Sequence, residues 1–333
     1  MTNVAVFGAG SWGTAFSIVL ADAGNEVAIW GRREAVCESI SVRHENPEYL
    51  PGVPLPVSVT ASHDPGKVLA GADVAVLAVP SQTLRANLAD WAPLLGDDVV
   101  MMSLMKGVEL GTSKRMSEVV AEVTGAAADR IAVLTGPNLA GEIANRQPTT
   151  SVIACTEDAV AQRLQRICHT AAFRPYTNTD VVGCELGGAT KNVIALAVGM
   201  AAGLGFGDNA RASVITRGLA ETARLGTAMG ADQLTFSGLA GLGDLVATCA
   251  SPLSRNRAFG EKLGRGMTVD EIVASTRQVA EGVKSCQSIT DLAKAHDVEM
   301  PIVDHVAALI RNEVTPREML TSLISRAAKP ERD

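Results

Sequence analysis

Short apolar runs alternate with helix-like segments along the first half of the chain. The runs Asn3–Phe7, Glu26–Trp30 and Asp73–Pro80 are separated by stretches with helical spacing, of which Trp12–Ala23 is the first. Short apolar runs bounded by turn signals are typical of buried strands, and their alternation with helices indicates βαβ units. Four further strand candidates follow at residues 98–103, 131–136, 150–156 and 173–178. The first half therefore predicts an α/β domain with a mostly parallel sheet.

Beyond about Gly183 the spacing becomes helical, with few strand signals. The helix-like segments are residues 185–202, 209–229, 254–263, 281–296 and 301–312. We therefore expect an all-α C-terminal domain and divide the chain into domains 1–182 and 183–333. A length of 333 residues is sufficient for two cores, because single cores stop growing at roughly 250 to 300 residues.

Three segments depart from these patterns. Four prolines between Asn46 and Pro56 exclude a regular helix, so we predict an exposed connection there. The charged end, residues 326–333, is expected to fray. The apolar stretch Val193–Phe206 contains three glycines and is shorter than the roughly 18 apolar residues that a spanning helix needs. We therefore predict no membrane span.

The first candidate site is the glycine loop Gly8-Ala9-Gly10-Ser11-Trp12-Gly13. It follows a predicted strand, opens a helix and leads to a second strand within about 30 residues. Gly8 permits the tight turn, Gly10 lets the backbone approach a pyrophosphate, and Gly13 allows close packing of helix and strand. The alternative is a glycine-rich turn that binds nothing. The βαβ context favours a Rossmann-type, dinucleotide-binding domain.

The residues after the second strand bear on which dinucleotide is bound. The chain reads Trp30-Gly31-Arg32-Arg33, without the acidic residue that usually contacts the ribose 2′-hydroxyl of NAD. Two guanidinium groups could instead pair with the 2′-phosphate of NADP. We predict NADP or NAD as cofactor, with a preference for NADPH. The alternative is that Arg32 and Arg33 are solvated residues of the next helix.

Three polar clusters lie where a carbonyl group could be held. Lys106 follows a strand, at the edge where parallel sheets present ligands, and could face both nicotinamide and substrate. The segment Thr135–Ala140 starts a helix whose amides suit an anion or a carbonyl oxygen, although an ordinary proline turn would look the same. Lys191 stands at the front of a very apolar helix. We favour proton transfer by Lys191 over the alternative of a snorkelling lysine.

The fourth cluster, Leu239–Asn256, is predicted to bind phosphate. It contains a glycine-rich turn with Asp244, and then Ser254, Arg255 and Asn256 at the start of a helix. An arginine, a hydroxyl group, an amide and a helix N-terminus together make a phosphate receptor. Asp244 could orient the lysine or hold a substrate hydroxyl, although an aspartate in a turn often only forms the turn.

Composition excludes several other classes. The net charge of −7 argues against a general nucleic-acid or anionic-membrane surface, and 3% aromatic residues are too few for a base-stacking surface. Six cysteines without a CxxC pair and five dispersed histidines lack metal or redox spacing, so we predict no metal and reduced, packed thiols. The first basic residue is Arg32, which is not the pattern of a signal peptide, and we expect a cytoplasmic location.

Together the motifs resemble the bacterial NAD(P)-dependent glycerol-3-phosphate dehydrogenase family. The similarity runs through GAGSWGTA, KGVE, GPNLAGE, GGATKNVIALAVG, LAGLGDLVATCASPLSRNRAFG and VAEGV. The resemblance implies reversible, NAD(P)H-dependent reduction of dihydroxyacetone phosphate to sn-glycerol 3-phosphate, a precursor for glycerophospholipid biosynthesis. It implies that Lys191 exchanges the proton at the substrate C2 oxygen and that Lys106 contacts both cofactor and substrate.

The same resemblance implies the remaining site residues. The substrate site would be lined by Gly136, Asn138, Asp244, Ser254, Arg255 and Asn256. The dinucleotide would contact Ser11, Trp12, Arg32, Lys106, Ala140, Arg255, Val279 and Glu281. Asn138 departs from the family pattern, which commonly has serine, so a hydroxyl contact becomes an amide contact.

Two other functions stay open at this point. A 3-hydroxyacid or 6-phosphogluconate-type dehydrogenase would share the Rossmann domain, the helical domain and a helix-borne lysine, and substrate screening separates it. A cofactor-sensing protein would bind the dinucleotide without turnover and would be indifferent to Lys191→Ala. A homodimer is compatible with a helical domain of apolar surface.

Overall fold

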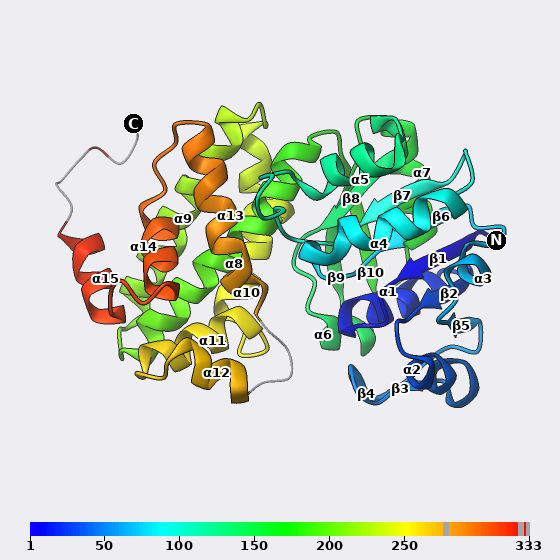
Figure 1. The fold of residues 1–333 in the computed structure, drawn as a ribbon, viewed down its shortest axis with the longest axis horizontal. Coiled ribbons are helices and arrows are strands. Elements are labelled where there is room, and N and C mark those ends of the chain that lie inside the picture. The colour runs from blue at the N-terminus through cyan, green and yellow to red at the C-terminus, as the bar shows by residue number, and fades with distance from the viewer. Residues whose placement is uncertain (276–279, 326–329, 331–333) are drawn as a thin grey trace.

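The computed structural model describes residues 1–275, 280–325 and 330, and it consists of a sheet-containing half and a helical half (Figure 1). The sheet has eight strands in the order β10-β9-β8-β7-β6-β1-β2-β5. Their bounds are β1 Asn3–Phe7, β2 Glu26–Trp30, β5 Val59–Ser62, β6 Val74–Leu77, β7 Val100–Ser103, β8 Ile131–Thr135, β9 Thr149–Ala154 and β10 Phe173–Asn178. Every neighbouring pair is parallel except β8 and β9. The mostly parallel sheet predicted from the sequence is therefore confirmed.

Helices cover both faces of this sheet, because successive side chains of a strand point to opposite sides. Val4 and Val6 of β1 pack in one core with Phe16, whereas Ala5 and Phe7 pack in another core on the opposite face. The helices of this half are α1 Ser11–Asp22, α2 Glu34–Glu38, α3 Pro65–Leu69, α4 Leu84–Trp91, α5 Met116–Thr124, α6 Ala140–Ala144 and α7 Asp158–Cys168. Both faces of the sheet are therefore covered, so a ligand can bind only at the edges of the sheet.

The helical half is built around the long helix α8. Its helices are α8 Val181–Gly203, α9 Asp208–Ala228, α10 Asp244–Ala250, α11 Arg255–Gly264, α12 Val269–Ser275, α13 Glu281–Ala295, α14 Pro301–Ile310 and α15 Pro316–Ile324. Helices α9, α10, α11 and α13 all pack against α8. The α8–α11 contact is unusually close, because a Cβ atom on Gly260 would lie only 2.1 Å from the Leu196 carbonyl oxygen. The predicted all-α domain is confirmed.

By length and composition α8 could cross a membrane. However, 94% of its most apolar window is buried inside the protein, as in the core helix of a folded domain. The side chain of Asp180 caps the helix by accepting a hydrogen bond of 2.8 Å from the Gly183 amide. This cap starts the helix well before the apolar stretch that the sequence pattern singled out.

The segment 46–56 is not the exposed connection that its prolines predicted. It forms a small antiparallel pair of strands, β3 (Glu45–Asn46) and β4 (Leu50–Pro54). Asn46 and Leu50 are buried, because this hairpin packs against the glycine loop.

All six cysteines are free and buried, as predicted. The predicted frayed end lies outside the described residues except for Pro330.

Candidate active site

The glycine loop lies where the sheet reverses its order of strand addition. β1 has β2 on one side and β6 on the other, which is where open α/β sheets bind ligands at their carboxyl edge. Gly8 has φ +130°, and a Cβ atom there would lie 2.5 Å from the Ala78 carbonyl oxygen. A Cβ atom on Gly13 would lie 2.0 Å from the Gly8 carbonyl oxygen. Both positions therefore require glycine, as the motif predicted.

Gly10 is different, because nothing lies within 4 Å of the position that its Cβ would take. It is also the N-cap of α1, and no side chain there accepts a hydrogen bond from the first turn. The N-terminus of α1 therefore lacks a side-chain cap and begins at a glycine with open space beside its Cα. This cradle fits the pyrophosphate of a dinucleotide.

The hairpin β3–β4 is fastened to this loop by side-chain hydrogen bonds. The Asn46 side-chain amide donates to the Ala9 carbonyl oxygen and to Thr14 Oγ1, both at 2.9 Å. Ser11 Oγ donates to the Tyr49 carbonyl oxygen at 2.6 Å. The hairpin thus forms one wall beside the cofactor loop, a feature that the proline pattern did not reveal.

The two arginines after β2 differ in their surroundings. Arg33 Nη2 lies 2.6 Å from Glu48 Oε2 and 3.2 Å from the Tyr49 hydroxyl, and the Arg33 guanidinium lies over the Tyr49 ring. Arg32 is exposed. An acidic side chain of the hairpin, Glu48, therefore pairs with one of the two cations predicted to bind a 2′-phosphate.

A buried carboxylate joins two lysines at the boundary between the two halves. Asp244 is 1% exposed. Lys106 Nζ donates to Asp244 Oδ2 at 2.6 Å and to the Gly136 carbonyl oxygen at 2.9 Å. Lys191 Nζ donates to Asp244 Oδ1 and, at 2.8 Å, to Thr248 Oγ1. Burial lowers the pKa of Lys106 to about 8, the neighbouring Lys191 acts in the same direction, and Asp244 opposes both.

Local structure explains how these groups meet. Lys106 follows β7, and its side chain crosses α8 at Gly188, where a Cβ atom would lie 3.4 Å from Lys106 Cγ. Asp244 begins α10, and Thr248 follows it one helical turn later. Lys191 lies in the middle of α8 rather than at its front, because the helix starts at the Asp180 cap. The predicted glycine-rich turn is a π-helical turn, Leu239–Gly243, that runs directly into Asp244.

The predicted phosphate receptor lies at the start of α11. Ser254 is the N-cap, and its Oγ accepts a hydrogen bond of 3.3 Å from the Arg257 amide. Arg255 is exposed, whereas Asn256 is buried. Asn256 Nδ2 donates to Asn192 Oδ1, and its Oδ1 accepts from the Gly282 amide, both at 2.9 Å. Asn256 therefore ties α11 to α8 and α13.

Two further contacts bring the receptor and the lysines together. Asn192 Nδ2 donates to the Lys106 carbonyl oxygen at 3.3 Å, next to the Asn192–Asn256 bond. Glu281, the first residue of α13, has its pKa raised by burial, and the positive charges of Arg255, Lys106 and Lys191 oppose that rise. The charges of Arg255, Lys106 and Lys191 therefore all act on the carboxyl group of Glu281. Val279 lies outside the described residues.

Asn138 and Ala140 lie on the segment after β8. Asn138 Oδ1 accepts a hydrogen bond of 2.5 Å from Ser151 Oγ, whereas its Nδ2 is buried and has no partner among the described residues. A buried amide donor without a partner is costly unless a ligand supplies the acceptor. Ala140 begins α6. Gly136 has φ +128° and presents its carbonyl oxygen to Lys106.

Sequence reasoning missed Thr248 and Asn192. Thr248 stands four residues after Asp244, a spacing that would place both on one face of a helix if the segment had been recognised as helical. Asn192 adjoins Lys191, but its role depends on the approach of α11 and could not be derived from local pattern.

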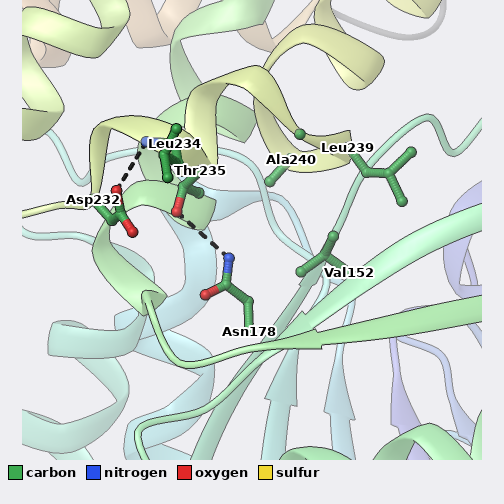
Figure 2. A pocket seen from close by; sticks show the side chains of 8 residues that line it. Val152, Asn178, Asp232, Leu234, Thr235, Leu239 and Ala240 are labelled. Atoms are coloured by element: carbon green, nitrogen blue, oxygen red, sulfur yellow. Dashed lines mark hydrogen bonds between the residues drawn. The ribbon is translucent and has the colours of Figure 1, made fainter.

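A pocket lies against the π-helical turn Leu239–Gly243 (Figure 2). It has a volume of about 210 Å³, and it is lined by Val152, Asn178, Asp232, Leu234, Thr235, Gly238, Leu239 and Ala240. In Figure 2 the Asn178 amide points to Thr235, to which it donates a hydrogen bond of 3.5 Å. The predicted site residues that the structure describes do not line it.

A glycine cradle at the switch point of the sheet, a lysine pair of which Lys106 follows a strand of the same sheet, and an arginine at a helix start are typical of a dinucleotide-dependent dehydrogenase with a helical second domain. Family models agree with this class. The N-terminal model of NAD-dependent glycerol-3-phosphate dehydrogenase matches residues 3–161, and the C-terminal model matches residues 180–321. The chain belongs to the NAD(P)-dependent glycerol-3-phosphate dehydrogenase family, as the sequence motifs predicted.

Individual relatives agree over the whole chain. The glycerol-3-phosphate dehydrogenase [NAD(P)+] of Streptomyces griseus is 65% identical over 330 residues, which is 99% of this chain and 98% of the relative. That of Thermobifida fusca is 62% identical over all of this chain and 99% of the relative. The crystal structure of glycerol-3-phosphate dehydrogenase from Coxiella burnetii has a TM-score of 0.93 and 36% identity, covering 98% of this chain and 99% of that one.

Proposed function

We propose that this enzyme reduces dihydroxyacetone phosphate to sn-glycerol 3-phosphate with a nicotinamide dinucleotide. The observation that carries the proposal is the Lys106–Asp244–Lys191 cluster, in which one buried carboxylate holds two ammonium groups beside the start of α11. Relatives at 62% and 65% identity carry the name of this activity, which supports the assignment. The supply of glycerophospholipid precursors would follow from the same reaction.

The cofactor would lie along the carboxyl edge of the sheet. The open backbone of Gly10 and the N-terminus of α1 would hold its pyrophosphate, with Gly8 and Gly13 fixing the loop and Ser11 and Trp12 beside it. Arg32 and Arg33 would lie at the ribose 2′ position, which is the basis of the predicted NADPH preference. Ala140, Lys106, Arg255 and Glu281 would complete the contacts. When bound, the cofactor supplies the hydride that reduces the ketone.

The substrate phosphate would bind at the start of α11. Arg255 can pair with a phosphate in a charge-assisted contact, and the N-terminus of α11 adds its dipole. Asn256 and Ser254 would fix this receptor and add polar contacts, while the unpartnered Asn138 amide would donate to a substrate oxygen. Binding energy at the phosphate, away from the reacting carbon, would position the ketone for reaction.

Lys191 would donate the proton to the C2 oxygen of the substrate. Asp244 and Thr248 orient its ammonium group, so the proton donor has a fixed direction. Lys106, held by the other oxygen of Asp244, would stabilise the negative charge that develops on the same oxygen. In the reverse direction Lys191 would accept this proton.

Four properties of the protein stay predictions. They are the domain boundary after residue 182, the preference for NADPH, the homodimer and the cytoplasmic location. Helix α8 begins at Val181, so the predicted boundary falls within its first turn.

The reaction itself is tested by identifying the product. Purified protein, dihydroxyacetone phosphate and NADPH should yield sn-glycerol 3-phosphate, detected by phosphorus NMR, in a one-to-one ratio with the NADPH consumed. NADPH consumption without this product would refute the proposed substrate.

A further inference from the structure

A second buried carboxylate, Glu185, joins the two halves of the protein away from the reacting groups. Glu185 lies on α8 and is 7% exposed. Its carboxylate accepts three hydrogen bonds: from Arg115 Nη1 at 2.5 Å, from the Ser117 amide at 2.8 Å and from Ser117 Oγ at 2.6 Å. Arg115 and Ser117 stand at the start of α5, in the sheet-containing half.

Both members of the ion pair are shielded from solvent. The side chains of Arg115 and Glu185 are 12% and 5% exposed. Burial raises the pKa of Glu185, whereas Arg115 and Ser117 favour its charged form. A buried ion pair contributes little net stability over a well-packed apolar contact, so its best-attested use is to fix one arrangement among several. Here the fixed arrangement is that of the chain between β7 and α5.

That chain segment, residues 104–117, carries Lys106 and is held along one face of α8. Residues spaced by three and seven positions lie on the same face of a helix. Glu185, Gly188 and Asn192 have this spacing, and each touches the segment. Glu185 holds its end, Gly188 makes room for the stem of Lys106, and Asn192 binds the Lys106 carbonyl oxygen.

The end held by Glu185 is connected to Lys106 within the segment. Arg115 pairs with Val108 in an antiparallel bridge, and the Lys114 carbonyl oxygen accepts a hydrogen bond of 2.9 Å from the Glu109 amide. Val108 is two residues from Lys106. A displacement of Arg115 would therefore be passed to Val108 and from there to Lys106.

We propose that Glu185 is a positioning residue: through Arg115 and Ser117 it fixes the segment 104–117 on α8 and so sets the place of Lys106 beside Asp244. Its kinetic consequence rests on the proposed function, in which Lys106 contacts cofactor and substrate. The anchoring of the segment does not depend on that function, so the two can be tested separately.

The test compares Glu185→Gln with the matched variant Glu221→Gln. Glu221 is also buried, at 4% exposure, but it lies on α9 and accepts hydrogen bonds from the Ile302 amide, at the start of α14. Hydrogen exchange measured by mass spectrometry should show faster exchange of residues 104–117 in Glu185→Gln only. Equal exchange of this segment in Glu185→Gln and wild type would overturn the proposal.

Steady-state kinetics with dihydroxyacetone phosphate provide the second measurement. Glu185→Gln should lower kcat roughly ten- to hundredfold, because displacing a catalytic group by about 1 Å costs about that much, while the dissociation constant of NADPH changes little. Glu221→Gln should keep the wild-type kcat. A Glu185→Gln enzyme with normal kcat would overturn the proposal.

Two further provisions keep the test decisive. Should Glu185→Gln fail to fold, Ser117→Ala removes one of the three hydrogen bonds and should give smaller changes in the same direction in both measurements. A Ser117→Ala variant with unchanged hydrogen exchange of residues 104–117 and unchanged kcat would count against the proposal. If wild-type protein did not turn over dihydroxyacetone phosphate, the proposed function would fall, whereas the exchange measurement would still decide whether Glu185 anchors the segment.

Discussion

The ammonium group of Lys106 lies 2.6 Å from Asp244 Oδ2, although 138 positions separate the two residues in sequence. Lys106 follows a strand of the sheet, whereas Asp244 begins a helix of the other half. The contact therefore closes the site across the boundary between the two halves. It places a cofactor-side lysine within reach of the helical groups that would hold the substrate.

Replacing Lys191 by methionine should remove the proton donor and keep most of the side-chain volume. We expect kcat to fall roughly 10²- to 10⁴-fold, the usual contribution of general acid catalysis, because the ammonium group held at Asp244 Oδ1 is lost. The affinity for NADPH, measured by titration of its fluorescence, should stay near the wild-type value. Wild-type kcat in Lys191→Met would remove Lys191 from the mechanism.

Arg255→Ala should lower kcat/KM for dihydroxyacetone phosphate severely, by about 10²-fold or more, because a charged partner of the phosphate is lost. Activity with unphosphorylated dihydroxyacetone should change little. Arg265→Ala is the matched control, since Arg265 follows α11, is 67% exposed and pairs only with Glu261 on the same helix in the described part of the chain. An equal loss with both substrates would contradict a phosphate role for Arg255.

The pH dependence of kcat/KM should reflect the titration of Lys106. Its pKa is lowered by burial from 10.5 to about 8, so the ammonium form, which attracts the anionic substrate, is lost above about pH 8. We therefore expect kcat/KM to fall as the pH rises through that value.

The free energy of unfolding should rise over the pH range in which kcat/KM falls. Between pH 8 and 10.5 the unfolded chain binds a proton at Lys106 that the folded protein does not, so this group adds stability as the pH rises. Urea denaturation of wild type and Lys106→Met across this range should isolate the effect of Lys106 on stability.

For the activity, a kcat/KM profile without a decline above about pH 8 would show that the charge on Lys106 is not required.

The choice between NADPH and NADH should depend on Glu48. Because Glu48 binds Arg33 at 2.6 Å, a cofactor 2′-phosphate has to compete with this carboxylate. The pair is about half exposed and such pairs are weak, so Glu48→Gln should raise the ratio of kcat/KM for NADPH over NADH by only about two- to fivefold. Glu45→Gln, which changes an exposed partner of Arg43 in the same hairpin, is the control.

Arg32→Ala should lower the ratio of kcat/KM for NADPH over NADH. An unchanged ratio in both Glu48→Gln and Arg32→Ala would mean that neither arginine recognises the 2′-phosphate. Binding of 2′,5′-ADP compared with 5′-AMP gives the same information without turnover.

Local pattern was sufficient for much of the fold. The strands with continuous apolar runs, such as Val100–Ser103 and Ile131–Thr135, and the five helices with clear spacing were predictable. The strand Val59–Ser62 was not, because its four residues carry little apolar signal. The hairpin at residues 45–54 was not either, since it is held by Asn46 contacts to the glycine loop rather than by its own pattern.

The site was predictable in its residue types but not in its contacts. Lys191, Asp244 and Lys106 could be singled out from motifs, yet their shared hydrogen bonds depend on how two halves of the chain pack. The same holds for Glu48, whose effect on Arg33 arises only because the hairpin brings the two side chains together. Contacts between segments far apart in sequence leave no periodic trace.

The initial rate of NADPH and NADH oxidation with dihydroxyacetone phosphate, compared with unphosphorylated dihydroxyacetone, tests the proposed reaction. We expect turnover that requires the phosphate, with NADPH oxidised faster than NADH. Equal rates with and without the phosphate, or no turnover with either cofactor, would contradict it.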